Sequence, residues 1–177
     1  MLKKVRGFTL IELLIVVAIL GILAALLIPN AITAIQKAKQ KSTMKDVMVI
    51  STALADYLTD NGIAPTQTGT YAAGSTFYKS VSPFYIKIMP VNDQWGNDFN
   101  IWCNDATSGY ANVTGANGDF VVASFGRDKT QQTNTGFSDS TPEDGLYIVN
   151  EMADFDNDLV AWNGSWICAP RSSATGT

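Results

Sequence analysis

The sequence contains no histidine, and this absence limits the chemistry that the chain could perform. Histidine is the commonest general base in enzymes and a frequent metal ligand. The sequence also lacks a Gly-x-Ser-x-Gly motif and a phosphate-binding glycine loop, and neither of its two cysteines is paired with a base. We therefore expect a protein that is not an enzyme.

Each half of the chain is poor in charge of one sign. Up to Lys45 there are seven basic residues and a single acidic one, Glu12, whereas from Asp46 onward there are fifteen acidic residues and five basic ones. An acidic C-terminal part repels nucleic acid, and a basic, apolar N-terminal part suits attachment to a membrane. We therefore expect the C-terminal part to make no contact with nucleic acid.

Charge is almost absent from residues 8–28, an apolar run that contains only Glu12. The run is long enough to cross a bilayer as a helix and longer than the apolar core of an ordinary secretory signal. A cleaved signal peptide ending near residues 24–25 or 30–31 is the alternative, but Glu12 fits poorly in such a core. At membrane depth a lone carboxylate costs about 2.5 to 3.5 kcal/mol, so Glu12 needs a partner.

The helical pattern continues past Pro29, because apolar residues recur every three or four positions as far as Leu58. Asn61 and Gly62 then end the pattern. These signals predict one helix from Phe8 to about residue 60, on the order of 80 Å long. Its front half, residues 8–28, is apolar on all sides, and its rear half, residues 29–61, is amphipathic and should pack on a globular head at residues 62–177.

The head reads as short elements separated by turns. Residues 62–76 have no periodicity and predict a loop, and Ser82 followed by Pro83 predicts the start of a short helix that ends at Pro90. Short β-branched and aromatic runs, "DFNIWC", "GDFVVASF" and "SWICA", predict strands. We therefore expect an α+β fold in which a long N-terminal helix packs against a small antiparallel β-sheet of three or four strands.

The N-terminal stretch "KKVRGFTLIELLIVVAILGILAALLIPN" resembles the leader and first helix of type IV pilins and of type II secretion pseudopilins. The resemblance implies that residues 1–7 are a leader, cut between Gly7 and Phe8 by a prepilin peptidase, and that Phe8 is then N-methylated. It also implies a single-pass protein of the bacterial inner membrane with a cytoplasmic leader and a periplasmic head.

The resemblance also suggests a role for Glu12 in filament assembly. Cleavage would create an ammonium group at Phe8, and a helix cannot bring its own Glu12 onto that nitrogen without distortion. A neighbouring subunit shifted along a helical homo-oligomeric filament can supply the partner charge, in an apolar setting where an unpaired carboxylate is expensive. The alternative is that Glu12 reaches the lipid headgroups by snorkelling.

The head carries a second resemblance, to the major pseudopilins of type II secretion. It rests on "IMPVNDQWGNDFNIW", "GDFVVASFGRD" and "DFDNDLVAWNG". Gln94 stands where that family usually has proline, and the segment at residues 129–153 is far longer than the family's loop. The resemblance implies a calcium site, for which the candidate oxygen ligands are Ser124, Asp128, Asp156 and Asp158, with Asp154 a weaker candidate. The alternative is a solvated acidic loop whose aspartates cap turns.

Cys103 and Cys168 are the two cysteines, and both fall in the predicted strands of the head. An exported domain meets an oxidising compartment, so we expect a disulfide between them. Two buried free thiols are the alternative.

These features predict a structural subunit of a type IV filament, most similar to the major pseudopilin of a type II secretion system. Such a subunit would work with minor pseudopilins or pilins and with an inner-membrane assembly platform that has its own ATPase. One alternative is the major pilin of a surface-exposed type IV pilus, which serves adhesion, motility or DNA uptake. Another is a monomeric membrane-anchored binding module that uses its tryptophans as a ligand face.

Overall fold

The computed structural model describes residues 8–110, 113–133, 135–138 and 141–171. It divides into two compact units, residues 1–37 and 38–177, and each is described by itself. A single helix, α1 (Leu10–Asn61), contributes to both units. The prediction of one long N-terminal helix is therefore confirmed, with Pro29 inside it.

The first unit is the apolar front of α1. Large apolar side chains from Leu10 to Ile28 are all exposed, between 45% and 82% of their area. Among the described residues, this is the one helix whose length and composition would let it cross a membrane. Such a continuous apolar surface needs a cover of lipid or of other protein.

Pro29 does not end α1, although proline removes one backbone donor from a helix. Two nearby polar side chains donate hydrogen bonds to helix carbonyls, one before Pro29 and one of Pro29 itself. The Asn30 amide donates to the Leu26 carbonyl at 3.3 Å, and the Thr33 hydroxyl donates to the Pro29 carbonyl at 3.1 Å. These are i to i−4 bonds from side chain to backbone in the two turns that flank Pro29, and neither reaches the carbonyl of Ala25, which loses its regular donor.

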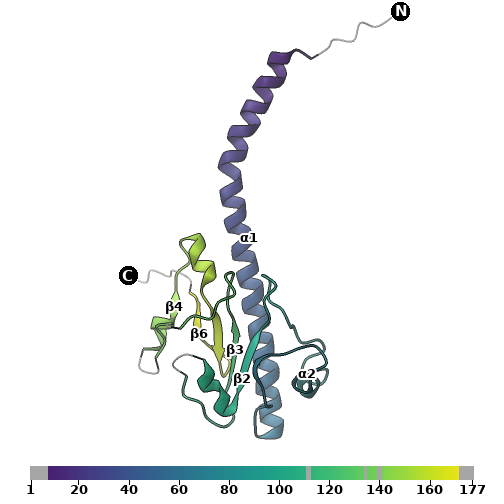
Figure 1. Cartoon of the computed structure of the whole chain (residues 1–177), viewed down its shortest axis with the longest axis vertical. Helices are drawn as coiled ribbons and strands as arrows, with labels where there is room; N and C mark the ends of the chain where they lie inside the picture. Colours follow the sequence, from purple (N-terminus) through teal and green to yellow (C-terminus); the bar gives the residue numbers. More distant parts are fainter. Residues whose placement is uncertain (1–7, 111–112, 134, 139–140, 172–177) are drawn as a thin grey trace, which may run out of the picture. The chain divides into compact units, whose positions relative to one another are not determined.

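The second unit contains a six-stranded sheet beside the rear part of α1 (Figure 1). The strand order is β1-β2-β3-β5-β6-β4, and all neighbours are antiparallel except β4 and β6, which are parallel. The strands are β1 (Thr68–Thr70), β2 (Asn100–Cys103), β3 (Phe120–Ser124), β4 (Leu146–Tyr147), β5 (Leu159–Trp162) and β6 (Ser165–Pro170). The α+β prediction is confirmed, with a mixed sheet in place of a purely antiparallel one.

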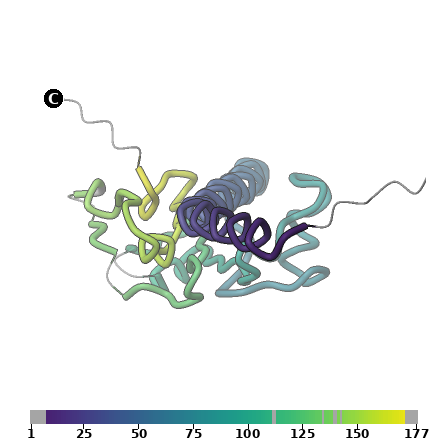
Figure 2. Tube along the Cα trace, turned by 90° about the horizontal axis from the view of Figure 1, so that it is seen from above, coloured from purple at the N-terminus to yellow at the C-terminus, as the bar shows by residue number. Residues whose placement is uncertain are grey.

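The central strands β2, β3 and β5 are buried on both faces, because their side chains alternate between two hydrophobic cores. Ile101 and Val122 point to the α1-side core, where α1 contributes Val47, Ile50 and Leu54. The second core lies on the opposite face, and its members are Trp102, Tyr110, Val113, Val121, Ala123, Phe137, Val160, Ile167 and Cys168. The short helix α2 (Thr76–Val81) lies on the other side of α1 from β4 (Figures 1 and 2).

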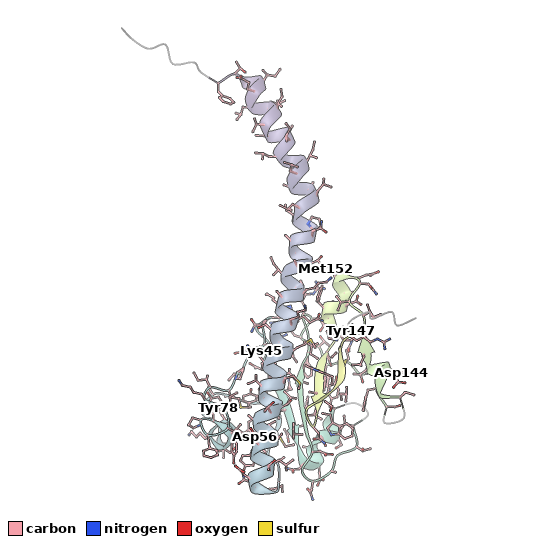
Figure 3. All side chains as sticks on the ribbon, turned by 180° about the vertical axis from the view of Figure 1, so that it is seen from behind. Lys45, Asp56, Tyr78, Asp144, Tyr147 and Met152 are labelled. Carbon is pink, nitrogen blue, oxygen red and sulfur yellow. The ribbon has the colours of Figure 1, made fainter. Side chains whose placement is uncertain are left out.

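The long segment at residues 129–153 builds structure rather than a bare loop. It contains a 3-10 turn, η2 (Pro142–Gly145), and the edge strand β4, and it leads into a second turn, η3 (Met152–Asp156). Tyr147 of β4 (Figure 3) accepts a hydrogen bond from Gln40 of α1 at 3.2 Å. A Cβ atom at Gly145 would overlap the Ile167 carbonyl oxygen, so the segment packs against the backbone of β6.

The structure corrects one helix prediction. Residues 82–90 do not form a helix that begins at Ser82. Instead α2 begins at Thr76, with Ser75 as its N-cap, and Ser82 is the residue that ends it. The bond between Ser82 and Pro83 is cis. The predicted loop at residues 62–76 also contains the short strand β1.

Candidate functional site

The N-terminal end of α1 forms a capping box between Thr9 and Glu12. Glu12 Oε2 accepts hydrogen bonds from the Thr9 backbone N–H at 2.9 Å and from the Thr9 hydroxyl at 2.6 Å. In return, the Glu12 backbone N–H donates to Thr9 Oγ1 at 3.3 Å. This arrangement satisfies helix-end donors, so Glu12 has a structural role within its own chain beside the assembly role that the sequence predicts.

The predicted cleavage point lies at the edge of the described residues. Gly7 falls outside them, whereas Phe8 is described and is 76% exposed. Cleavage and N-methylation at this point therefore stay predictions. The exposure of Phe8 leaves its side chain available to lipid or to a neighbouring subunit.

In the head, buried Asp93 organises the turn between Met89 and β2. Its Oδ1 accepts the backbone N–H groups of Trp95 and Asn97, both at 2.8 Å. Its Oδ2 accepts the hydroxyl of Ser124 at 2.7 Å and the side-chain amide of Asn97 at 3.2 Å. Asp93 therefore joins this turn to the end of β3, and Ser124 is turned toward Asp93.

The chain reverses direction after β3 at Gly126, which has a φ of +64°. A Cβ at this position would lie 2.7 Å from the Asn157 carbonyl oxygen, so the two backbones touch here. The next residue, Arg127, donates its backbone N–H to the Phe155 carbonyl at 2.9 Å. Its guanidinium group binds Asp156 through two parallel bonds, from Nε to Oδ1 at 2.7 Å and from Nη2 to Oδ2 at 2.9 Å.

Asp158 lies in a separate buried cluster. Its Oδ2 accepts the Tyr110 hydroxyl at 2.8 Å and the Gln132 backbone N–H at 3.0 Å, and its side chain is fully buried. Burial, with a smaller contribution from nearby Asp128, raises the pKa of Asp158 to about 6 against the lowering effect of these two hydrogen bonds. Oδ1 of Asp158 has no hydrogen-bond partner among the described residues.

The remaining acidic candidates cap local turns. Asp128 is exposed, and its Oδ1 accepts the Thr130 backbone N–H at 3.0 Å. Asp154 Oδ2 accepts the backbone N–H groups of Asn150 and Glu151, both at 2.7 Å, and these bonds lower the pKa of Asp154. Both aspartates therefore cap turns, as expected for a solvated acidic loop that binds no metal.

The arrangement does not fit a calcium ion that is shared by all four predicted ligands. Calcium takes six to eight oxygens. Ser124 is turned to Asp93, and Asp156 is occupied by Arg127. Asp128 and Asp158 are close enough to interact electrostatically, but the described part of the chain contains no group of three acidic, cysteine or histidine side chains placed to hold a metal. Calcium binding itself stays an untested prediction.

The disulfide prediction is wrong, because Cys103 and Cys168 are both free and buried. They lie on β2 and β6, which are separated by β3 and β5. Three strand spacings alone place them at least about 14 Å apart, whereas bridged cysteines have their Cα atoms within about 7 Å. They also belong to opposite cores, Cys103 on the α1 side and Cys168 in the second core. The alternative of two buried thiols is the correct one.

The tryptophans of the sheet do not share one ligand face. Trp102 and Trp162 pack in the second core, whereas Trp166 packs against the α1-side core. Trp102 is 93% buried, with its ring 5.8 Å from that of Tyr110. The sheet tryptophans are therefore packing residues, which removes the main feature behind the binding-module alternative.

Gln94, which stands where the resembling family usually has proline, makes two hydrogen bonds to α1. Its backbone N–H, which a proline would lack, donates to Thr43 of α1 at 3.2 Å. Its side-chain amide donates to Asp46 at 3.2 Å. Gln94 therefore fixes the turn directly onto α1.

Several residues of the site have roles that the sequence does not predict. Asp93 stood within a quoted motif, and its burial could be suspected from the tight Trp-Gly turn that follows it. No local pattern predicts the roles of Arg127, Tyr110 and Gln132, because their hydrogen-bond partners lie between 25 and 48 residues away in the sequence. Their roles depend on the tertiary fold.

Comparison with known proteins gives matches over most of the chain. Residues 2–28 match the prokaryotic N-terminal methylation motif, and residues 30–140 match the model of type II secretion system (T2SS), protein G. No solved structure matches the chain.

Two relatives illustrate the similarity. The type II secretion system core protein G of Vibrio cholerae is 38% identical over 104 residues, which cover 55% of this chain and 70% of the relative. That of Pseudomonas aeruginosa is 35% identical over 133 residues, which cover 71% of this chain and 86% of the relative. Because the family model covers more than half of the chain, and the P. aeruginosa relative is matched over most of its length, this chain belongs to the type II secretion system protein G family.

Proposed function

We propose that this chain is the major structural subunit of a type II secretion pseudopilus, a filament that drives protein export across the outer membrane. The observation that carries the proposal is the apolar front of α1, whose large side chains are exposed from Leu10 to Ile28. A surface of this kind needs a cover, which lipid supplies before assembly and the helices of neighbouring subunits supply within a filament.

The same features support a location and an orientation. The methylation motif precedes the apolar helix, which suits a single-pass protein of the bacterial inner membrane. In this proposal the leader is cytoplasmic, the prepilin peptidase cuts between Gly7 and Phe8, and the head lies in the periplasm. The acidic balance of the head, which disfavours contact with nucleic acid, is compatible with that place.

The proposed partners are further copies of the chain, minor pseudopilins, and an inner-membrane platform with an assembly ATPase. We assign no catalytic step to the chain itself. A type IV pilus is the less favoured filament, because the cysteine pair that suggested it is not bonded and the head matches protein G.

The test is to overproduce the chain in a host that has a complete type II secretion system and to examine sheared cell-surface fractions by immunoelectron microscopy. The expected result is filaments labelled by antibody against the head. The matched control is Gly7→Ala, which should block removal of the leader and leave the chain unassembled at the precursor size. Labelled protein that stays monomeric in the membrane after leader removal would contradict the proposal.

A further inference from the structure

We propose that the guanidinium group of Arg127 supplies the positive charge in the loop after β3, so that this loop is fastened to the segment before β5 without a bound calcium ion. The proposal concerns the folding of the head and holds whichever filament the chain builds.

The contacts of Arg127 already perform what a bound cation would do. Its two parallel bonds to Asp156, at 2.7 and 2.9 Å, neutralise that carboxylate. A bidentate pair of this kind fixes orientation as well as charge. The backbone N–H of the same residue bonds to Phe155, so Arg127 joins the two segments through both main chain and side chain.

Several other polar groups around the loop are hydrogen-bonded within the protein. Ser124 donates to Asp93, and the Asn97 amide donates to the Gly126 carbonyl at 2.5 Å. Gln132 and Asp158 exchange backbone and side-chain bonds at 3.0 and 3.3 Å. These bonds hold the loop at both ends without a metal.

A calcium ion that recruited Asp156 would meet a direct obstacle. It would displace the Arg127 bonds and would place two positive charges within a few ångströms of each other, which is repulsive. Without Asp156 and Ser124, the predicted site keeps two carboxylates, Asp128 and Asp158, which supply at most four of the six to eight oxygens that calcium takes. Backbone carbonyls and water would have to supply the rest. The unpartnered Oδ1 of Asp158 is the feature that most favours an ion, and the experiment addresses it directly.

The experiment is thermal unfolding of the full chain in detergent micelles, followed by tryptophan fluorescence, with calcium chloride and with the chelator EGTA. The variants are Arg127→Gln, Asp156→Asn, the two combined, and Asp158→Asn. Lys129→Gln is the matched control, because it removes an exposed positive charge two residues further along the same loop.

We expect the wild-type melting temperature to be the same in calcium and in EGTA. Arg127→Gln should lower it by about 2–4 °C in both conditions, as expected for loss of a partly exposed bidentate pair in a domain of this size. Lys129→Gln should not lower it. The combined variant should lose little more than either single one, since both remove the same interaction.

Two outcomes would overturn the proposal. One is a wild-type melting temperature that rises with calcium and loses that rise in Asp158→Asn, which would place an ion at Asp158. The other is an Arg127→Gln variant as stable as Lys129→Gln. The chelator comparison on the wild type remains decisive even if the Arg127 variant fails to fold.

Discussion

The hydroxyl of Ser124 donates a 2.7 Å hydrogen bond to Asp93 Oδ2, and this bond joins the end of β3 to the turn that precedes β2. Both side chains are buried, Ser124 completely and Asp93 to 94%. Asp93 also accepts two backbone N–H groups of its own turn. One carboxylate thus satisfies donors from two segments that are distant in the sequence.

We predict that Asp93→Ala destabilises the head by about 2–4 kcal/mol, because it leaves several buried donors without an acceptor. The measurement is chemical denaturation of the full chain in detergent. Asp98→Ala is the control, since Asp98 is exposed and its side chain bonds only to Asn92 among the contacts described. Equal losses in the two variants would show that Asp93 does not organise this turn.

The free cysteines lead to a second prediction. Burial raises the pKa of both the Cys103 and the Cys168 thiols to about 12, so neither should react while the protein is folded. We expect a thiol reagent to label no cysteine in the native protein and two after denaturation without reductant. If the denatured protein showed free thiols only after reduction, Cys103 and Cys168 would be joined by a disulfide, which would contradict the structure.

Asp158 gives a pH dependence with a defined sign. Its pKa is about 6 in the folded protein and near its ordinary value of 3.8 when unfolded, so the folded state binds the proton more tightly. Its contribution to stability is complete below about pH 4 and is lost as the pH rises through 6.

We therefore expect Asp158→Asn to gain stability relative to the wild type between pH 4 and pH 7, by on the order of 3 kcal/mol. The measurement is the free energy of unfolding of both proteins across that range. The difference in free energy of unfolding between the two proteins reports on Asp158 alone, because the other carboxylates titrate in both. A difference that stays constant from pH 4 to pH 7 would contradict the raised pKa.

The sequence predicted the elements whose signals are local. The long helix was predictable because its apolar run and its amphipathic pattern continue to Asn61. The strands β2, β3 and β6 were predictable from their β-branched and aromatic residues. The strand β5 was missed because it follows an aspartate-rich turn directly, and its four residues looked like the end of that turn. The two-residue strand β4 exists only because it pairs with β6.

The disulfide prediction failed for the same reason. Cys103 and Cys168 looked pairable because both lie in strands, but the order of strands in the sheet keeps them apart. The candidate calcium ligands follow from the family motifs and from their oxygen-bearing side chains, and neither signal shows that Asp156 is bound by Arg127. Strand order and side-chain partners are tertiary properties, so no local pattern could reveal them.

The capping box at the start of α1 allows the two roles of Glu12 to be separated. Glu12→Val removes both the cap and the charge that a neighbouring subunit would pair with. Thr9→Ala removes the hydroxyl half of the cap but keeps the carboxylate. We expect Glu12→Val to insert in the membrane and fail to assemble, and Thr9→Ala to assemble nearly normally. Equal defects in the two variants would mean that capping alone explains Glu12.

The most direct measurement of the central claim is protein secretion by the source bacterium after deletion of this gene. We expect the enzymes exported by its type II system to accumulate in the periplasm, and plasmid-borne wild-type chain to restore their release into the medium. The Glu12→Val chain, present at the same level in the membrane, should not restore it. Undiminished secretion in the deletion strain would contradict the assignment of this chain as the major subunit of the secretion filament.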